Sequence, residues 1–132
     1  MKKFSMKIKV YYEDTDAGGV MYHASHIRFM ERARTDFLYA EGLDIAAYQA
    51  RGQYFVVSHV DIHYRAPVHL GEVLDVTAEI GEVRRASVTV HQTIMRDGVL
   101  VAEADITIVF RDTRGIIRLP DEVLAIARAC SK

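Results

Sequence analysis

The segment SHIRFMERARTDFLYAEG, residues 25–42, predicts the one long helix of this chain and thereby the layout of the fold. Its apolar residues recur every three or four positions, which aligns them as one stripe along a helix. Ser25 is the expected N-cap and Gly42 the expected stop. Because the apolar face is wide, we expect the helix to lie inside the protein. The stripe consists of Ile27, Met30, Ala33, Phe37 and Ala40.

Strand patterns lie on both sides of this helix. Residues 6–12 alternate apolar and polar side chains, as a half-buried strand does. A short helix is expected at 43–51 and a tail helix at 121–129, with acidic residues first, as the helix dipole favours. The Asp97-Gly98 pair suits a hairpin turn between the last two strands. Four strands are expected after the long helix, at 54–66, 73–80, 86–96 and 99–110.

A single helix segregated from a run of strands indicates an α+β domain. We expect an antiparallel, curved sheet of about five strands wrapped around one long central helix, because that arrangement buries both apolar faces. The length of 132 residues suits a single domain over 1–132. A net charge of −1 without basic runs argues against nucleic acid as a partner.

The cysteine count and the hydropathy limit the class of protein further. Cys130 is the only cysteine, which excludes an intrachain disulfide and a thiolate zinc cluster. The N-terminus lacks the apolar region of a signal peptide, and no apolar run approaches the ~20 residues that span a bilayer. We therefore expect a cytoplasmic protein without a membrane span.

The loop YYEDTDAGGVMYH, residues 11–23, contains the candidate catalytic residues. A single loop acid is most often a turn or capping residue. Here Asp16 lies among two further acids, and Gly18 and Gly19 let a ligand approach the backbone closely. Free N–H groups at a helix start polarise a carbonyl, while a carboxylate attacks it or deprotonates a water. The pattern favours acyl chemistry.

The residues YYEDTDAGGVMYHASH, followed by FMERART, resemble the 4-hydroxybenzoyl-CoA thioesterase family of hotdog-fold proteins. The resemblance is greatest to the branch of small acyl-CoA thioesterases associated with the Tol–Pal system, the YbgC type. The segment YRAPVHLGE at 64–72 also resembles that family. The family motif is an aspartate, a glycine pair and a tyrosine-histidine pair before the central helix. This chain supplies Asp16, Gly18, Gly19, Tyr22 and His23 at matching spacing.

The resemblance implies an acyl-CoA thioester hydrolase with Asp16 as the catalytic carboxylate. It also implies that backbone N–H groups near Tyr22 and His23 bind the thioester oxygen. His23 lines the site by the same resemblance, and its side chain is a candidate to position water or to hold Asp16. His26 stands where the family usually has an aromatic residue, most often tyrosine, that faces the acyl pocket or the partner subunit. The resemblance therefore does not identify the preferred acyl group. No metal or prosthetic group is expected, because a thioester is already activated.

Two features of the strand at 54–66 concern binding. His59, Asp61 and His63 alternate on one face like metal ligands, but structural zinc takes four ligands and no fourth is evident. We therefore predict a polar face and no metal site. Ser58 is expected on the opposite, apolar face. By the resemblance, the edge around Ser58 and His59 lies near the site of a partner subunit.

Three arginines are candidates to bind the phosphates of coenzyme A, because a guanidinium binds phosphate bidentately. Solvated loop charge is an equally good interpretation of each; they are Arg65, Arg84 and Arg85. A curved sheet around one helix also leaves an edge strand open. Two such sheets can join edge to edge with the acyl site at the seam, which predicts a homodimer or a homotetramer.

Two other functions are compatible with these residues. A hotdog dehydratase acting on hydroxyacyl thioesters pairs a loop histidine with an acid on the central helix, here His23 with Glu31 or Asp36. A non-catalytic acyl-binding protein of the Tol–Pal envelope machinery would keep the motif as ancestry only. An envelope or acyl-carrier protein is accordingly a possible partner.

Overall fold

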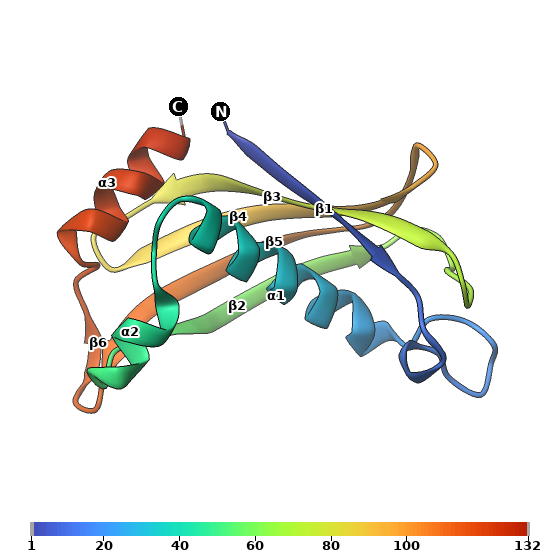
Figure 1. Cartoon of the computed structure of the whole chain (residues 1–132), viewed down its shortest axis with the longest axis horizontal. Coiled ribbons are helices and arrows are strands. Elements are labelled where there is room, and N and C mark those ends of the chain that lie inside the picture. The colour runs from blue at the N-terminus through green and yellow to red at the C-terminus, as the bar shows by residue number, and fades with distance from the viewer. Residues whose placement is uncertain (1, 132) are drawn as a thin grey trace.

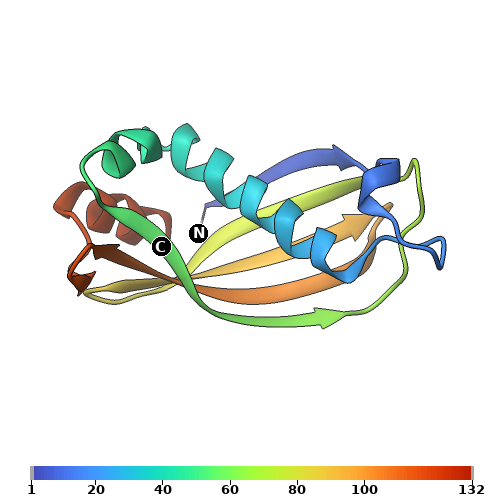
Figure 2. The same ribbon diagram turned by 90° about the horizontal axis from the view of Figure 1, so that it is seen from below.

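The computed structural model describes residues 2–131, in which one curved antiparallel sheet wraps around a long helix (Figure 1, Figure 2). The six-stranded sheet has the order β1-β3-β4-β5-β2, and β6 pairs with β5. In chain order the elements are β1 (Lys3–Lys9), the 3-10 helix η1 (Tyr12–Asp14), α1 (His23–Ala40), α2 (Ile45–Ala50), β2 (Tyr54–Tyr64), β3 (Val73–Val83), β4 (Ser87–Arg96), β5 (Val99–Asp112), β6 (Gly115–Ile117) and α3 (Asp121–Cys130).

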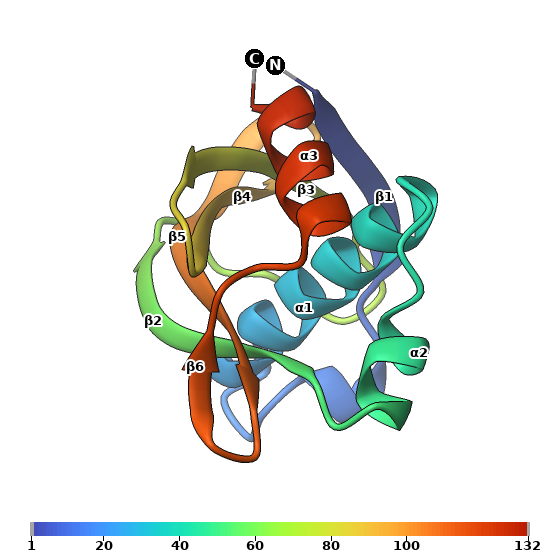
Figure 3. The same ribbon diagram turned by 90° about the vertical axis from the view of Figure 1, so that its left-hand side faces the viewer.

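Helix α1 lies inside the curve of the sheet, as Figure 3 shows in an end-on view. Phe29, Met30 and Ala33 have no exposed surface. The predicted stripe is confirmed at Met30, Ala33 and Phe37, whereas Ala40 in the last turn is exposed. Burial of such side chains contributes about 1.5–3 kcal/mol for each large one. The sheet side chains in the core cluster of Met30 include Leu74, Val76, Ile94 and Ile106.

A second core cluster fills the end of the sheet where α2 and α3 pack. The ring of Tyr48 from α2 lies edge-on to Phe55 and Phe110, with centroids 6.1 and 5.6 Å away. The Tyr48 hydroxyl donates a hydrogen bond to Glu122 of α3. Burial, together with this carboxylate, raises the pKa of Tyr48 to about 12. Helix α3 is thus anchored at the end of the molecule far from the start of α1 (Figure 1).

The predicted elements are confirmed with shifted ends. The long helix stops before Gly42, which has the positive φ of 90° typical of a helix stop. Asp97 and Gly98 have φ of 47° and 80°, as the predicted hairpin turn requires. The first strand ends at Lys9 instead of residue 12, because the chain turns into η1. The short strand β6 was not predicted.

The predicted role of Ser25 as N-cap is wrong. The helix begins three residues earlier than that role implies, at His23, and Tyr22 occupies the N-cap position without a side-chain cap. Ser25 is buried in the first turn, where its hydroxyl donates to the backbone carbonyl of Asp14 at 3.1 Å. The hydroxyl therefore satisfies a carbonyl of the preceding loop, a contact that local sequence pattern does not reveal.

The predicted placement of Ser58 on the apolar face is also wrong. The pairing of β2 with β5 shifts between Val57 and His59, which makes Ser58 the extra residue of a β-bulge. Val57, on the N-terminal side of the bulge, is paired with Ile108 on the apolar face of β5. Ser58 is exposed and its hydroxyl donates to the carbonyl of Thr107 at 3.3 Å. A bulge breaks the strict alternation of side chains, so counting every second residue across it assigns residues to the wrong face of the sheet.

Candidate active site

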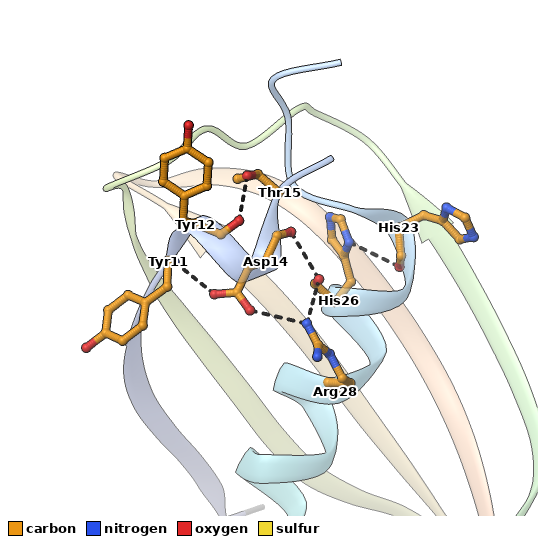
Figure 4. A network of polar contacts seen from close by, with 8 residues as sticks. Tyr11, Tyr12, Asp14, Thr15, His23, His26 and Arg28 are labelled. Carbon is orange, nitrogen blue, oxygen red and sulfur yellow. Dashed lines mark hydrogen bonds and ion pairs between the residues drawn. The ribbon is translucent and has the colours of Figure 1, made fainter. Parts of the chain in front are cut away.

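The loop before α1 is braced to the helix by Asp14 (Figure 4). Asp14 is 3% exposed, and its carboxylate accepts the Tyr11 N–H at 2.8 Å and pairs with the Arg28 guanidinium at 3.2 Å. Its backbone carbonyl accepts the Tyr22 N–H at 2.8 Å and the hydroxyl of Ser25. Local sequence patterns indicate no role for Asp14 or Arg28. An acid and a base fourteen positions apart carry no local signal that they meet.

Asp16 lies at the tip of this braced loop, which is closed by a β-bridge between Thr15 and Met21. One carboxylate oxygen, Oδ1, accepts the Gly18 N–H at 2.8 Å. A Cβ at Gly18 would lie 3.1 Å from that oxygen, and Gly19 has a φ of +82°. The positive φ of Gly19 favours glycine there, whereas a side chain at position 18 would push the Asp16 carboxylate aside by a few tenths of an ångström. The carboxylate is exposed, and Oδ2 accepts no hydrogen bond from residues 2–131.

Among the described residues, the first turn of α1 offers two N–H groups that are not hydrogen-bonded. Tyr22 turns the chain into the helix with φ −62° and ψ 137°. The Ser25 N–H donates back to the Tyr22 carbonyl at 2.8 Å, whereas the N–H groups of His23 and Ala24 find no acceptor within the described chain. They stand at the positive end of an 18-residue helix. Such N–H groups are suited to bind an oxygen that gains negative charge.

The two histidines of the motif have different surroundings. His23 is exposed, and its ring lies beside that of Tyr22, with 4.4 Å between centroids. His26 is only 4% exposed and meets the ring of Tyr64 edge-on at 4.8 Å between centroids. Its Nδ1 lies 3.3 Å from the His23 carbonyl oxygen. His26 is thus buried in the first turn of α1, against Tyr64. The predicted contact of His26 with substrate stays a prediction.

Burial lowers the pKa of His26 below its ordinary value of 6.5. The folded state therefore favours the neutral ring, and the unfolded chain binds the proton more tightly. We expect the free energy of unfolding to be constant well above pH 6.5 and to fall as the pH drops through 6.5 toward the folded pKa. One proton limits this slope to about 1.4 kcal/mol per pH unit.

Urea unfolding of the wild type and of a His26→Gln variant across this range checks the expectation, because the glutamine cannot titrate. The difference in unfolding free energy between the two proteins should be constant well above pH 6.5 and should change as the pH drops through 6.5. Parallel pH curves for both proteins would contradict it.

The polar face of β2 holds no preformed metal site. The His63 ring lies 3.1 Å from the Asp61 carboxylate. No group of three ligand-type side chains within residues 2–131 is arranged to hold a metal ion. His59 and Ser58 are exposed on the edge strand of the sheet. Within that same part of the chain, no helix combines the length and apolarity that a membrane crossing requires.

The predicted phosphate-binding arginines fall in two places. Arg65 follows β2 and pairs with Glu103 at 3.6 Å. Arg84 and Arg85 lie in the turn between β3 and β4, where they line a surface cleft beside α3. That cleft also contains Arg118 and Arg128. Because α3 and the Asp16 loop are at opposite ends of the molecule, one protomer does not bring Arg84 and Arg85 to its own Asp16 (Figure 1).

A family model described as "Thioesterase-like superfamily" matches residues 10–126. The chain belongs to this superfamily. The match includes the braced loop, Asp16 and the whole of α1. The resemblance that the loop motif indicated is therefore confirmed.

Individual relatives of this thioesterase-like protein agree with the assignment. "Acyl-CoA thioester hydrolase YbgC" of Escherichia coli O6:H1 is 40% identical over 110 residues, which cover 83% of this chain and 82% of the relative. A hypothetical protein from Thermus thermophilus has a TM-score of 0.92 and 30% identity, with 98% of each chain covered. A 4-hydroxybenzoyl-CoA thioesterase mutant in complex with 4-hydroxybenzoyl-CoA has a TM-score of 0.87 at 19% identity. The match covers 96% of this chain and 99% of that chain, and it shows a likeness of fold alone. The predicted hotdog fold is confirmed.

Proposed function

We propose that this thioesterase-like protein hydrolyses acyl-CoA thioesters to the free acid and coenzyme A. One observation carries the proposal: two N–H groups that find no acceptor in residues 2–131 open α1, directly after a loop that presents an oxygen of Asp16 equally unpaired there. The name of the Escherichia coli relative, which is 40% identical, supports the same activity. Acid and amides of this kind are what acyl transfer from a thioester needs.

The chemistry divides the work between these groups. The N–H of His23, with that of Ala24 beside it, stabilises the negative charge that develops on the thioester oxygen. Asp16 either attacks the carbonyl carbon, which expels the CoA thiolate and leaves a mixed anhydride for water to cleave, or removes a proton from the attacking water. Both routes end in the free acid and the thiol. Neither requires a metal ion or a prosthetic group.

A substrate panel tests this proposal. Short, medium and long straight-chain acyl-CoAs and aromatic acyl-CoAs are incubated with the protein, and thiol release is measured. We expect release from at least one class. Acyl-CoA binding without any thiol release would support the acyl-binding alternative instead, and loss of water without thiol release would support a dehydratase.

The geometry of α1 does not favour the dehydratase. Glu31 lies eight positions after His23, which corresponds to about 12 Å along a helix axis. The Glu31 carboxylate accepts a hydrogen bond from Thr35 at 2.9 Å. Asp36 lies further along the helix and is exposed. Within one protomer, both acids are therefore remote from His23 along α1.

We propose that the site is completed by a second copy of the chain. Strand β2 is an edge strand, and Val56 and Val57 on it are 37% and 43% exposed. Pairing of two β2 edges would cover this apolar surface and bring Ser58 and His59 toward the partner's loop. Light scattering at assay concentration should give a dimer or a tetramer, and an active monomer would contradict the proposal.

The cytoplasmic location and an envelope or acyl-carrier partner stay predictions.

We further propose that Arg84 and Arg85 bind CoA phosphates from a neighbouring protomer. The double replacement Arg84→Ala/Arg85→Ala should raise KM for acyl-CoA by about tenfold or more, since charge-assisted hydrogen bonds of 1.5–3 kcal/mol are lost. It should leave KM for the matching acyl-pantetheine unchanged, because that substrate lacks the nucleotide. Arg114→Ala, which removes another exposed arginine from a turn, is the control. An equal rise for both substrates would contradict phosphate binding.

A further inference from the structure

Tyr64, the last residue of β2, contacts the first residue of α1. Its hydroxyl donates a hydrogen bond to the His23 carbonyl oxygen at 2.7 Å. Its ring meets the His26 ring at an interplanar angle of 88°. Nδ1 of His26 lies near the same carbonyl oxygen at 3.3 Å. A strand end and the helix itself therefore place two polar side-chain groups on one backbone oxygen.

That oxygen belongs to the peptide unit that carries one of the two unpaired amides. The His23 carbonyl and the Ala24 N–H are parts of a single planar peptide, so fixing the oxygen also fixes the direction of the N–H. A hydrogen bond accepted by the carbonyl polarises the unit and strengthens its N–H as a donor. The first turn of α1 has no side-chain cap to do this from the N-terminal side.

The phenol is suited to this task over the neutral pH range. Partial burial raises the pKa of Tyr64 above its ordinary value of 10, so the hydroxyl stays protonated and remains a donor. The contact also joins two segments far apart in sequence, residues 23 and 64. It holds the end of the edge strand against the helix start.

We propose that Tyr64 is a positioning residue for thioester hydrolysis. Its hydroxyl holds the His23–Ala24 peptide so that the Ala24 N–H points, with the His23 N–H, at the thioester oxygen. The inference rests on the proposed function and adds to that site a residue that does not touch the substrate.

The replacement Tyr64→Phe tests the proposal, because it removes the hydroxyl and keeps the ring against His26. We expect kcat and kcat/KM to fall together by about three- to tenfold, with KM within twofold of wild type, since the interaction acts in the transition state. Tyr54→Phe is the matched control. Tyr54 begins the same strand and is similarly exposed, and its hydroxyl makes no hydrogen bond within the described residues.

Two further measurements separate positioning from a general loss of structure. Tyr64→Phe should stay folded at the assay temperature, with a Tm only a few degrees below that of Tyr54→Phe, because it loses one hydrogen bond. In isotope-labelled protein, the His23 carbonyl carbon and Ala24 amide nitrogen resonances should shift in Tyr64→Phe and stay unchanged in Tyr54→Phe. Active wild type with an unchanged kcat in Tyr64→Phe would overturn the role of Tyr64 alone. Unshifted His23 and Ala24 resonances would overturn it as well, whatever the activity. A wild type that hydrolyses no acyl-CoA would reject the proposed function itself.

Discussion

Replacing Asp16 by asparagine is expected to lower kcat for acyl-CoA hydrolysis by about 10²–10⁴-fold, the usual contribution of an acid–base group. The amide neither attacks a carbonyl nor removes a proton from water. The side-chain oxygen still accepts the Gly18 N–H, so the loop should keep its shape. KM and the free energy of unfolding should therefore change little. Thiol release under saturating substrate gives kcat, and urea unfolding gives the stability.

Asp44→Asn is the matched control for this experiment. The Asp44 carboxylate is also exposed and also accepts a backbone N–H, that of Ala47 at 3.1 Å, at the start of α2. It should retain wild-type kcat. Wild-type turnover in Asp16→Asn would remove Asp16 from the mechanism. In active wild type, mass spectrometry of acid-quenched protein distinguishes the two routes: an acyl group attached to the peptide containing Asp16 indicates nucleophilic attack.

The second large effect is expected from His23→Pro, which deletes one N–H of the helix start. Proline is accepted at the first position of a helix, and Tyr22 before it already has the extended ψ of 137° that a following proline requires. The helix should therefore form. Loss of one donor to the developing oxyanion should lower kcat by about 10²–10³-fold.

His23→Ala separates the backbone from the side chain at this position. It removes the exposed imidazole and keeps the N–H. If the amide carries the function, His23→Ala keeps kcat within about tenfold of wild type while His23→Pro does not. An equal loss in both variants would assign the function to the imidazole. Circular dichroism of both proteins should show the helix content of the wild type.

The sequence predicted those elements whose signals are local. The spacing of Met30, Ala33 and Phe37 indicated the buried face of α1, because these residues are close neighbours on one helix. Asp97-Gly98 indicated a hairpin, since few other pairs adopt its positive φ angles. The order of one long helix among strands then left few ways to bury both apolar faces.

Sequence patterns failed where a contact joins distant segments. Nothing around Asp14 shows that its carboxylate meets Arg28 or that its carbonyl receives Ser25. The bulge at Ser58 interrupts a regular alternation of side chains, and the bond of Tyr64 to His23 crosses forty-one positions. The distance of Arg84 from Asp16 in one protomer also depends on the path of the whole sheet.

The amino-acid sequence by itself determined the long helix and the turns, because each depends on backbone preferences or spacing within a few residues. The resemblance of the loop motif to a known family added the hotdog class and the expectation that Asp16 is the catalytic carboxylate. The tertiary structure alone decided which amides at the helix start stay unpaired and which side chains hold the loop and the first peptide in place. Those features depend on hydrogen bonds between segments that only folding brings together. Their geometry is set by the packing of α1 against the curved sheet.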